Sequence, residues 1–323
     1  MENRTRIAVL GAGTMGAGMA VTYALGGYEV GLYSRTEKTL ERARGVIESS
    51  LTLLTEEGGL APDTAAAAAG RIRCTTSVEE AVRDAWYVAE TVAEVAEIKE
   101  GLYRQLDKLL PEGIILASNT SALNVFALIP PARQSHAVIA HFFAPAHILP
   151  LVEVIRGPET KEAVMDTVLT LHQECGKTPI RMEQFVPGFI INRLQRSMNR
   201  EVMFLLENGY CSPEDIDLAV KASLMPRGML LGLVQRMDFT GLDMMANSFR
   251  DTGYTAAPPT QGTPRMIAEH YERGELGVKT GRGFYDYAGQ SYGEILLRRD
   301  RQLLKSVRLA QELLSDPLDT KED

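Results

Sequence analysis

The chain has few cysteines, no basic tract and no long apolar run. Its 323 residues include only Cys74, Cys175 and Cys211, too few and too widely spaced for a disulfide framework or a metal cluster. No apolar stretch approaches the roughly 18 residues that a membrane-spanning helix needs. Residues 3–6 are polar or charged and lead directly into a short apolar run, unlike a secretory signal peptide. We therefore expect a cytoplasmic protein without a metal or a membrane span.

The charge balance argues against a nucleic-acid partner. The chain carries 34 lysine and arginine residues against 42 aspartate and glutamate residues, for a net charge of −8. Nucleic-acid binding requires clustered basic side chains, and the sequence has no basic tract of that kind. Its length of 323 residues, of which 45% are apolar, favours two domains that each bury a core.

Strand and helix patterns alternate along the first part of the chain, which predicts a parallel sheet with right-handed crossovers. The predicted strands are Arg6–Leu10, Glu29–Tyr33, Arg71–Cys74, Tyr87–Glu90, Ile114–Ala117, Ala137–Phe142, Leu151–Ile155 and Thr178–Arg181. The predicted helices between them are Thr14–Leu25, Val78–Asp84, Ile98–Leu110 and Lys161–Cys175, with a helical hairpin over residues 37–70. We therefore expect an α/β domain with a helical insertion.

The strand patterns end near Pro187 and Gly188, a pair typical of a hinge. Helical spacing follows over Phe189–Asn208, Pro213–Ala222, Leu230–Gln235, Asp243–Arg250, Pro264–Arg273 and Tyr292–Ser315. We predict an α/β domain over residues 1–186 and an all-α domain over residues 187–323. The apolar helices of the second domain favour a homodimer, because a small helical domain often gains stability through a shared core.

A glycine motif joins the first predicted strand to the first predicted helix, and it reads Gly11-Ala12-Gly13-Thr14-Met15-Gly16. The first glycine permits a tight turn, the second lets the backbone approach a pyrophosphate, and the third allows close packing of helix on strand. The helix N-terminus adds unpaired N–H groups and the positive end of its dipole. The motif, set between a strand and a helix, predicts a dinucleotide site in a Rossmann-type domain, with contacts from Gly11, Gly13, Thr14, Met15 and Gly16.

The end of the second predicted strand indicates which dinucleotide binds. A carboxylate about 20 residues beyond the glycines is typical of NAD sites, where it bonds the ribose 2′-hydroxyl. This chain has Ser34 followed by Arg35 at that place. Serine does not repel a 2′-phosphate and arginine attracts one, so we expect NADP in preference to NAD. Alternatively, Arg35 is solvated or stacks on the adenine, and NAD is accepted.

A histidine and a glutamate are candidates for acid–base chemistry. His141 ends a predicted strand in His141-Phe142-Phe143-Ala144-Pro145, and Glu153 lies 12 residues later within an otherwise apolar strand. Two strands joined through a proline-bounded loop bring imidazole and carboxylate together, which fixes the tautomer that a general base requires. An unpaired charge in such a strand is costly, so Glu153 needs a partner. Taken alone, His141 also fits a purely structural role.

In combination, these segments resemble the L-3-hydroxyacyl-CoA dehydrogenase family over nearly the whole chain. The resemblance rests on spaced motifs in the same order: Gly11–Gly16, Glu90–Lys99, Ser118–Ser121, His141–Pro145 with Leu151–Ile155, Pro187–Leu194 and Gly277–Tyr287. It implies hydride transfer between a nicotinamide cofactor, NADP or NAD, and the C3 atom of a small hydroxyacyl substrate. An all-α second domain and a site between the two domains are expected with it.

The resemblance also implies roles for individual residues. His141 corresponds to the catalytic base, Glu153 to the carboxylate that orients it, Ser121 to a donor to the reacting oxygen, and Asn192 to a residue that holds the substrate. Further residues, expected at the ribose–nicotinamide end of the cofactor, are Glu94, Lys99 and Asn119. The residue types alone equally fit a helix N-cap at Ser118–Ser121, an interhelical hydrogen bond from Asn192 and a solvated Glu94/Lys99 pair.

The substrate is less well defined. Ala144 stands where the family often has asparagine. The hairpin that helps to hold CoA in the family has no lysine between Thr39 and Ile98 and carries Glu56-Glu57 at its tip, although the phosphates of CoA attract cations. The arginines available there are Arg42, Arg44, Arg71 and Arg73.

The long C-terminal helix is more like that of the free-acid relatives, gulonate and carnitine dehydrogenases, and of lambda-crystallin. The resemblance to the family as a whole nevertheless implies, first, a CoA thioester substrate and a place in fatty acid metabolism. A free 3-hydroxy acid is the alternative, and a non-catalytic dinucleotide-binding protein is the third possibility.

Overall fold

The computed structural model describes residues 5–250, 262–315 and 318, and it divides the chain into two compact units, residues 1–193 and 194–323. Residues 3 and 4 of the polar N-terminus lie outside the described part. Because the division follows Arg193, Asn192 falls in the same unit as His141, not in the helical unit where the sequence analysis places it. No helix among the described residues is long and apolar enough to cross a membrane.

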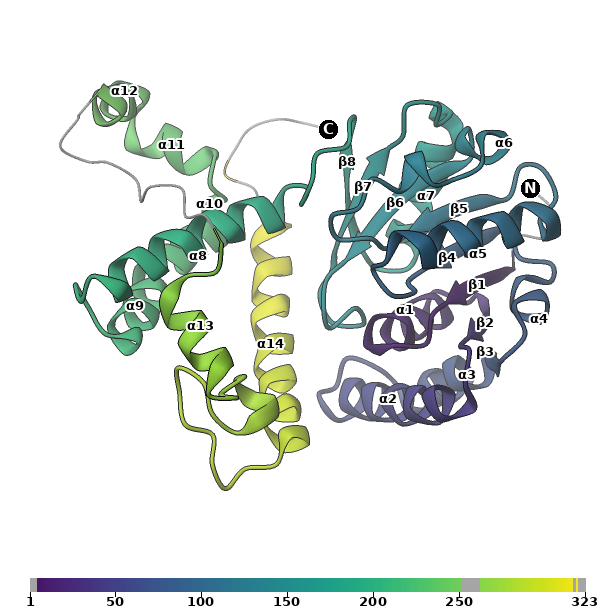
Figure 1. Ribbon diagram of the computed structural model, residues 1–323, viewed down its shortest axis with the longest axis horizontal. Helices are drawn as coiled ribbons and strands as arrows, with labels where there is room; N and C mark the ends of the chain where they lie inside the picture. Colours follow the sequence, from purple (N-terminus) through teal and green to yellow (C-terminus); the bar gives the residue numbers. More distant parts are fainter. Residues whose placement is uncertain (1–4, 251–261, 316–317, 319–323) are drawn as a thin grey trace. The chain divides into compact units, whose positions relative to one another are not determined.

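The first unit is built on a single sheet of eight strands in the order β3-β2-β1-β4-β5-β6-β7-β8 (Figure 1). The strands are β1 (Arg6–Leu10), β2 (Glu29–Tyr33), β3 (Ile72–Thr75), β4 (Tyr87–Glu90), β5 (Ile115–Ser118), β6 (Ala137–Phe142), β7 (Leu151–Arg156) and β8 (Thr178–Met182). The strand order reverses at β1, so the carboxyl ends of β1 and β4 flank the crevice in which such sheets bind dinucleotides. The α/β class expected for this region is confirmed.

One strand pair departs from the parallel arrangement that the alternation predicts, because β6 and β7 run antiparallel. The other six pairs are parallel. The connection over residues 143–150 carries Pro145 and Pro150 and is too short for a crossover, which needs a dozen or more residues. The chain therefore turns back directly, and the register places His141 opposite Glu153.

Helices cover both faces of this sheet. They are α1 (Thr14–Leu25), α2 (Glu37–Glu56), α3 (Pro62–Arg71), α4 (Val78–Val82), α5 (Ala96–Leu109), α6 (Pro131–Gln134) and α7 (Glu162–Glu174), with a 3₁₀ turn, η1 (Val125–Ala127). Alternate residues of β1 face opposite clusters: Ile7 and Val9 pack with α1, α2 and α7, and Ala8 and Leu10 with α4 and α5. The two faces together hold the strands in place.

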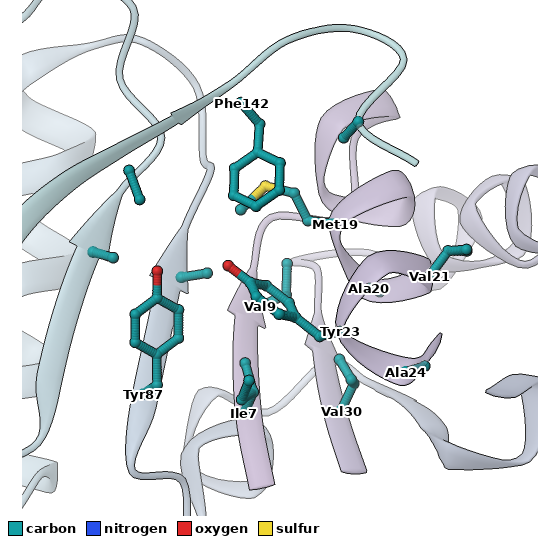
Figure 2. Close-up of a cluster of buried hydrophobic side chains, with 14 of the residues drawn as sticks. Ile7, Val9, Met19, Ala20, Val21, Tyr23, Ala24, Val30, Tyr87 and Phe142 are labelled. Atoms are coloured by element: carbon teal, nitrogen blue, oxygen red, sulfur yellow. The ribbon is translucent and has the colours of Figure 1, made fainter. Parts of the chain in front are cut away.

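Aromatic rings fill the first of these clusters (Figure 2). The Tyr23 ring makes edge contacts with Tyr87 and Phe142, at centroid distances of 5.9 and 6.1 Å. All three rings are buried. Burial of each contributes about 2–3 kcal/mol, so this cluster anchors α1 and β6, the elements that carry the glycine motif and His141.

The regular elements of the second unit are all helices within its described residues, joined by turns and loops. Its elements are the continuation of α8 (Ile191–Glu207), then α9 (Pro213–Ala219), η2 (Val220–Leu224), α10 (Met225–Leu231), α11 (Gln235–Thr240), α12 (Leu242–Arg250), α13 (Arg265–Glu272), η3 (Val278–Thr280) and α14 (Tyr292–Leu314). The helix predicted over Leu230–Gln235 is wrong. Gly232 has a positive φ of 66° and ends α10 inside that range, a conformation that glycine adopts without strain.

Candidate active site

The antiparallel pair β6–β7 joins the two residues expected to carry the chemistry. His141 Nδ1 lies 2.8 Å from Glu153 Oε2, and both side chains are buried. A carboxylate can only accept at this contact, so Nδ1 donates and Nε2 is left as the basic nitrogen of the ring. The partner that Glu153 requires is therefore His141.

The second oxygen of Glu153 holds the start of α8. Glu153 Oε1 accepts hydrogen bonds from the backbone N–H groups of Ile190 and Ile191, at 2.9 and 3.0 Å. Free N–H groups at a helix start attract an anion, which accounts for a charge inside an apolar strand. Asn192 is the next residue along the chain, so the carboxylate that orients the histidine also fixes the turn that carries Asn192.

Aromatic rings flank the imidazole. The His141 ring lies 4.6 Å from the Phe143 centroid and 5.2 Å from the Phe189 centroid. Phe189 is fully buried and has a positive φ of 50°, which is uncommon for a bulky residue. These rings limit rotation of the imidazole and exclude water from its sides.

Asn119 connects the histidine strand to the loop after β4. Its side-chain oxygen accepts a hydrogen bond from the N–H of Phe142 at 2.8 Å, and its amide nitrogen donates to Thr91 Oγ1 at 3.1 Å. Asn119 thus joins the residue after His141 to the residue after Glu90. The sequence analysis expected Asn119 near the cofactor, and the structure places it at the carboxyl edge of the sheet.

Lys99 and Glu94 are not a solvated pair. The Lys99 side chain is 1% exposed, and its Nζ atom lies 2.7 Å from Glu90 Oε1 and 3.3 Å from Glu94 Oε2. The alternative of a solvated helix face is therefore wrong for Lys99, which lies beneath the surface and anchors two carboxylates. Helical spacing could not reveal this burial, because Glu90 belongs to a strand.

Glu94 in turn holds the segment that contains Ser121. Its Oε1 atom accepts hydrogen bonds from Thr120 Oγ1 at 2.5 Å and from the backbone N–H of Ser121 at 2.8 Å. Partial burial acts to raise the pKa of Glu94, but the bonds from Thr120 and the charge of Lys99 outweigh it and hold the pKa below its usual range. Glu94 is therefore an ionised anchor for this loop.

The N-cap alternative for residues 118–121 is also wrong. Ser118 Oγ donates to Glu90 Oε2 at 2.6 Å, and the next helical turn, η1, begins only at Val125 without a side-chain cap. Ser121 is exposed, as a residue that meets a substrate should be. Within residues 5–193 the side-chain amide of Asn192 forms no hydrogen bond, and its role stays a prediction.

The glycine loop has the geometry that a pyrophosphate requires. A Cβ atom on Gly16 would lie 1.7 Å from the carbonyl oxygen of Gly11, and Gly11 has a positive φ of 119°. Gly13 is different, because a Cβ atom there would meet nothing within 4 Å. Gly13 is also the N-cap of α1 and gives it no side-chain cap, so the N–H groups of Thr14 and Met15 lie beside open space. An anion fits there.

The residues expected to select the dinucleotide lie just past β2. Ser34 is buried, and its N–H donates to the carbonyl of Thr75 at 3.2 Å. Arg35 is exposed, and its guanidinium has no partner within the described residues. It is therefore available to a ligand.

Several residues that position this site were not predicted individually from the sequence. Glu90, Tyr103 and Thr120 are buried, and they form hydrogen bonds in the β4–α5 and β5 region. A glutamate in a strand of otherwise apolar residues was a signal for Glu90, as it was for Glu153. Nothing in the sequence singled out Tyr103, which has ordinary helical spacing in α5.

Family comparison agrees with this architecture. The profile of the 3-hydroxyacyl-CoA dehydrogenase NAD binding domain matches residues 6–185, and that of the 3-hydroxyacyl-CoA dehydrogenase C-terminal domain matches residues 188–287. The chain belongs to the 3-hydroxyacyl-CoA dehydrogenase family. It is an NAD-dependent oxidoreductase of that family, which confirms the resemblance and the two-part fold class.

Relatives span most or all of the chain. The 3-hydroxybutyryl-CoA dehydrogenase of Clostridioides difficile is 34% identical, over 87% of this chain and 99% of its own. The L-carnitine dehydrogenase of Streptomyces coelicolor is 30% identical, over 97% and 96%. Among solved structures, the NAD⁺-dependent 5-formyl-3-hydroxy-2-methylpyridine 4-carboxylic acid 5-dehydrogenase superposes with a TM-score of 0.85 and 30% identity, over 95% of this chain and 98% of its own.

Proposed function

We propose that this member of the family oxidises a 3-hydroxy acid to its 3-keto form, and catalyses the reverse reduction, with His141 as general base and acid. The 2.8 Å bond between His141 Nδ1 and Glu153 Oε2 carries this proposal. It fixes the tautomer in which Nε2 is unprotonated and can accept a proton. Glu153 then stabilises the imidazolium that forms.

In the oxidative direction, Nε2 of His141 takes the hydroxyl proton while the carbon loses hydride. A bound nicotinamide dinucleotide, held by the glycine loop and the start of α1, supplies the hydride chemistry. Ser121 donates a hydrogen bond to the reacting oxygen, and Asn192 holds the substrate beside the imidazole. In reduction the imidazolium returns its proton to the same oxygen. The protein thus supplies placement and proton transfer.

We propose a free carboxylic acid, rather than a CoA thioester, as the substrate. Residues 37–71 of the α2–α3 hairpin carry six acidic and four basic side chains. Two of the four basic side chains already have partners. Arg44 forms an ion pair with Glu37 at 2.6 Å, and Arg71 donates a hydrogen bond to the carbonyl of Ala24 at 3.2 Å. The hairpin cavity of about 700 Å³ is lined largely by apolar side chains, together with Glu48, Glu56 and the Arg44 that is paired with Glu37. The phosphates of CoA would find little attraction there.

Chain length supports the same substrate class. The CoA-type relative covers 87% of this chain, whereas the carnitine dehydrogenase and the pyridine-carboxylate dehydrogenase cover 97% and 95%. These two relatives named for free acids therefore match more of this chain than the 3-hydroxybutyryl-CoA dehydrogenase does, although 99% of the latter is matched. This reverses the order of the two substrate classes given by the sequence resemblance.

A CoA thioester is the second candidate, and two observations favour it. Identity to the 3-hydroxybutyryl-CoA dehydrogenase is 34%, against 30% for the carnitine dehydrogenase. Arg42 and Arg73 also remain exposed without a partner among the described residues. With this substrate the enzyme would act in fatty acid metabolism.

The test follows absorbance at 340 nm while NAD⁺ or NADP⁺ is offered with 3-hydroxybutyrate, carnitine and gulonate, and separately with 3-hydroxybutyryl-CoA. We expect turnover with a free acid and a kcat/KM for the CoA ester at least tenfold lower. A preference for the CoA ester contradicts the proposed substrate class. His141→Gln should lower kcat by about 10³-fold with little change in dinucleotide affinity, and unchanged turnover would remove His141 from the mechanism.

We also propose that the enzyme uses NADP in addition to NAD, and that it is a homodimer. The free Arg35 guanidinium beside Ser34, which carries no charge, supports the first point. Large exposed apolar side chains concentrated in α10–α12 support the second.

A further inference from the structure

The buried carboxylate of Glu90 lies among the loops of the candidate site, but it takes no part in the proposed reaction. Glu90 is the last residue of β4, and it has no exposed surface. Its Oε1 atom accepts from Lys99 Nζ at 2.7 Å and from the N–H of Val92 at 2.8 Å. Its Oε2 atom accepts from Tyr103 Oη and Ser118 Oγ, both at 2.6 Å. The four donors lie in the loop after β4, on α5 and at the end of β5.

These four bonds make the carboxylate difficult to replace. Each oxygen accepts from two donors, and an amide in its place would turn an N–H group toward donors. Burial, with the adjacent charge of Glu90, raises the pKa of Tyr103 well above its usual value, so that phenol stays protonated as a donor. Lys99 has no water to turn to if Glu90 is lost, because its side chain is only 1% exposed.

The first branch of contacts reaches the dinucleotide loop. The register places Glu90 beside Leu10, the residue before Gly11. Thr91 and Val92 press against that loop: a Cβ atom on Gly11 would lie 2.4 Å from the carbonyl oxygen of Thr91. The bond from the Val92 N–H to Glu90 therefore fixes the segment against which the glycine loop rests.

The second branch reaches the Ser121 loop by two routes. In the first route, Lys99 contacts both Glu90 and Glu94, and Glu94 accepts a hydrogen bond from the backbone N–H of Ser121. On the other side, Ser118 Oγ bonds Glu90 and accepts from the N–H of Thr120 at 3.3 Å. Both ends of the segment before Ser121 thus depend on one carboxylate.

We propose that Glu90 is a positioning residue whose buried carboxylate sets the placement of the Ser121 loop relative to the dinucleotide loop. It touches neither substrate nor cofactor and acts through Val92, Lys99 and Ser118. The inference rests on the proposed function for the roles of the two loops, but the coupling itself is a property of the chain.

The experiment compares Glu90→Gln with the double variant Glu90→Gln/Lys99→Met. In the single variant the buried charge of Lys99 keeps only Glu94, 3.3 Å away; the double variant removes that charge, so its thermal midpoint should recover toward the wild-type value. Amide hydrogen exchange, measured without any dinucleotide, should be faster in residues 91–95 and 118–123 of both variants. With substrate, kcat should fall about 100-fold in both, since a displacement near 1 Å costs that much, while KM changes less.

Glu100→Gln is the matched control. It is the same substitution on α5, the helix that carries Lys99 and Tyr103, but its carboxylate forms an exposed pair with Arg104, so exchange and kcat should stay at wild-type values. Unchanged exchange in either loop of Glu90→Gln overturns the proposal, as does recovery of wild-type exchange and kcat in the double variant. Absence of turnover in the wild type with every substrate would refute the proposed function instead, and the exchange measurement would still decide the role of Glu90.

Discussion

At the scale of single residues, buried charge is what separates this chain from a bare dinucleotide-binding scaffold. Glu90 and Glu153 are fully buried, and each accepts hydrogen bonds from several donors. Both carboxylates end up beside loops that the chemistry needs. An apolar residue at either place would leave these donors without partners and would position nothing.

His172 makes a pH-dependent contribution to stability. Its Nδ1 atom donates to the carbonyl of Val168 at 2.7 Å, and its Nε2 atom accepts from Tyr23 Oη at 3.3 Å. Burial, aided by the charge of Lys177, lowers the pKa of His172 to about 4. The unfolded chain binds this proton near the ordinary pKa of about 6.5, so the stabilisation is present above that pH and is lost as pH falls through 4.

The free energy of unfolding should therefore fall more steeply with acid in the wild type than in His172→Gln. Between pH 7 and pH 5 the difference between the two proteins should shrink by about 2 kcal/mol. Urea unfolding followed by fluorescence of Trp86, the single tryptophan, measures it in the first unit. His270→Gln in the second unit is the control. A difference that does not vary with pH would contradict the neutral state assigned to His172.

Arg35 is the residue that should set coenzyme preference. Its guanidinium is exposed, without a partner among the described residues, and under the proposed use of NADP it would bind the 2′-phosphate. Arg35→Asp should shift the ratio of kcat/KM for NAD over NADP by about tenfold or more, because a carboxylate repels the phosphate and bonds the 2′-hydroxyl. Steady-state kinetics with both coenzymes measures the ratio. An unchanged ratio would leave NADP use without a basis.

At the scale of elements, most of the fold could be predicted because its strands and helices have clear periodicity. The helix Thr14–Leu25 and the strand Tyr87–Glu90 occur with the predicted bounds. The direction of β7 could not be read from its own residues, since an apolar strand looks alike in either direction. The information lay in the short loop before it.

The candidate site was predictable only in part. The His141–Glu153 pair could be inferred because each residue is anomalous in its own strand. Lys99 could not, because its burial depends on a partner nine residues away on another element. Local patterns report which face of a helix is apolar, and they do not report which charges a neighbouring strand neutralises.

Substitutions at two glycines of the β1–α1 turn should distinguish a loss of dinucleotide binding from a loss of stability. Gly13→Ala adds a Cβ atom that meets no protein atom within 4 Å, so the free energy of unfolding should change little. The same atom occupies the space through which a pyrophosphate approaches, and dinucleotide Kd should rise at least about tenfold. Gly16→Ala should lose both binding and stability, because its Cβ atom would collide with the carbonyl of Gly11.

Fluorescence titration with NADH and urea unfolding measure these two effects. Gly45→Ala, on α2 and with equally open surroundings, is the control and should bind NADH as the wild type does. Wild-type affinity in Gly13→Ala would place the pyrophosphate elsewhere.

At the scale of the whole molecule, the proposed chemistry and the proposed association fall in different units. The residues argued to act on substrate and cofactor all belong to the first unit, residues 1–193. In the second unit, large apolar side chains are exposed from α10 to α12: Leu230, Leu233, Val234, Phe239, Leu242, Met244 and Phe249. A monomer rarely exposes so many in one segment, which is the ground for expecting a second copy to cover them.

The homodimer should therefore dissociate when this segment is charged. Val234 is 76% exposed and Phe239 65%, so Val234→Glu/Phe239→Glu should not disturb the fold of one chain but should place four carboxylates in a shared interface. Light scattering after gel filtration should give twice the chain mass of 35.5 kDa for the wild type and the single mass for the variant. Tyr271→Glu, 73% exposed on α13, is the control and should remain dimeric. A wild-type protein of single mass at micromolar concentration would contradict the assignment, and the apolar side chains would then need another partner.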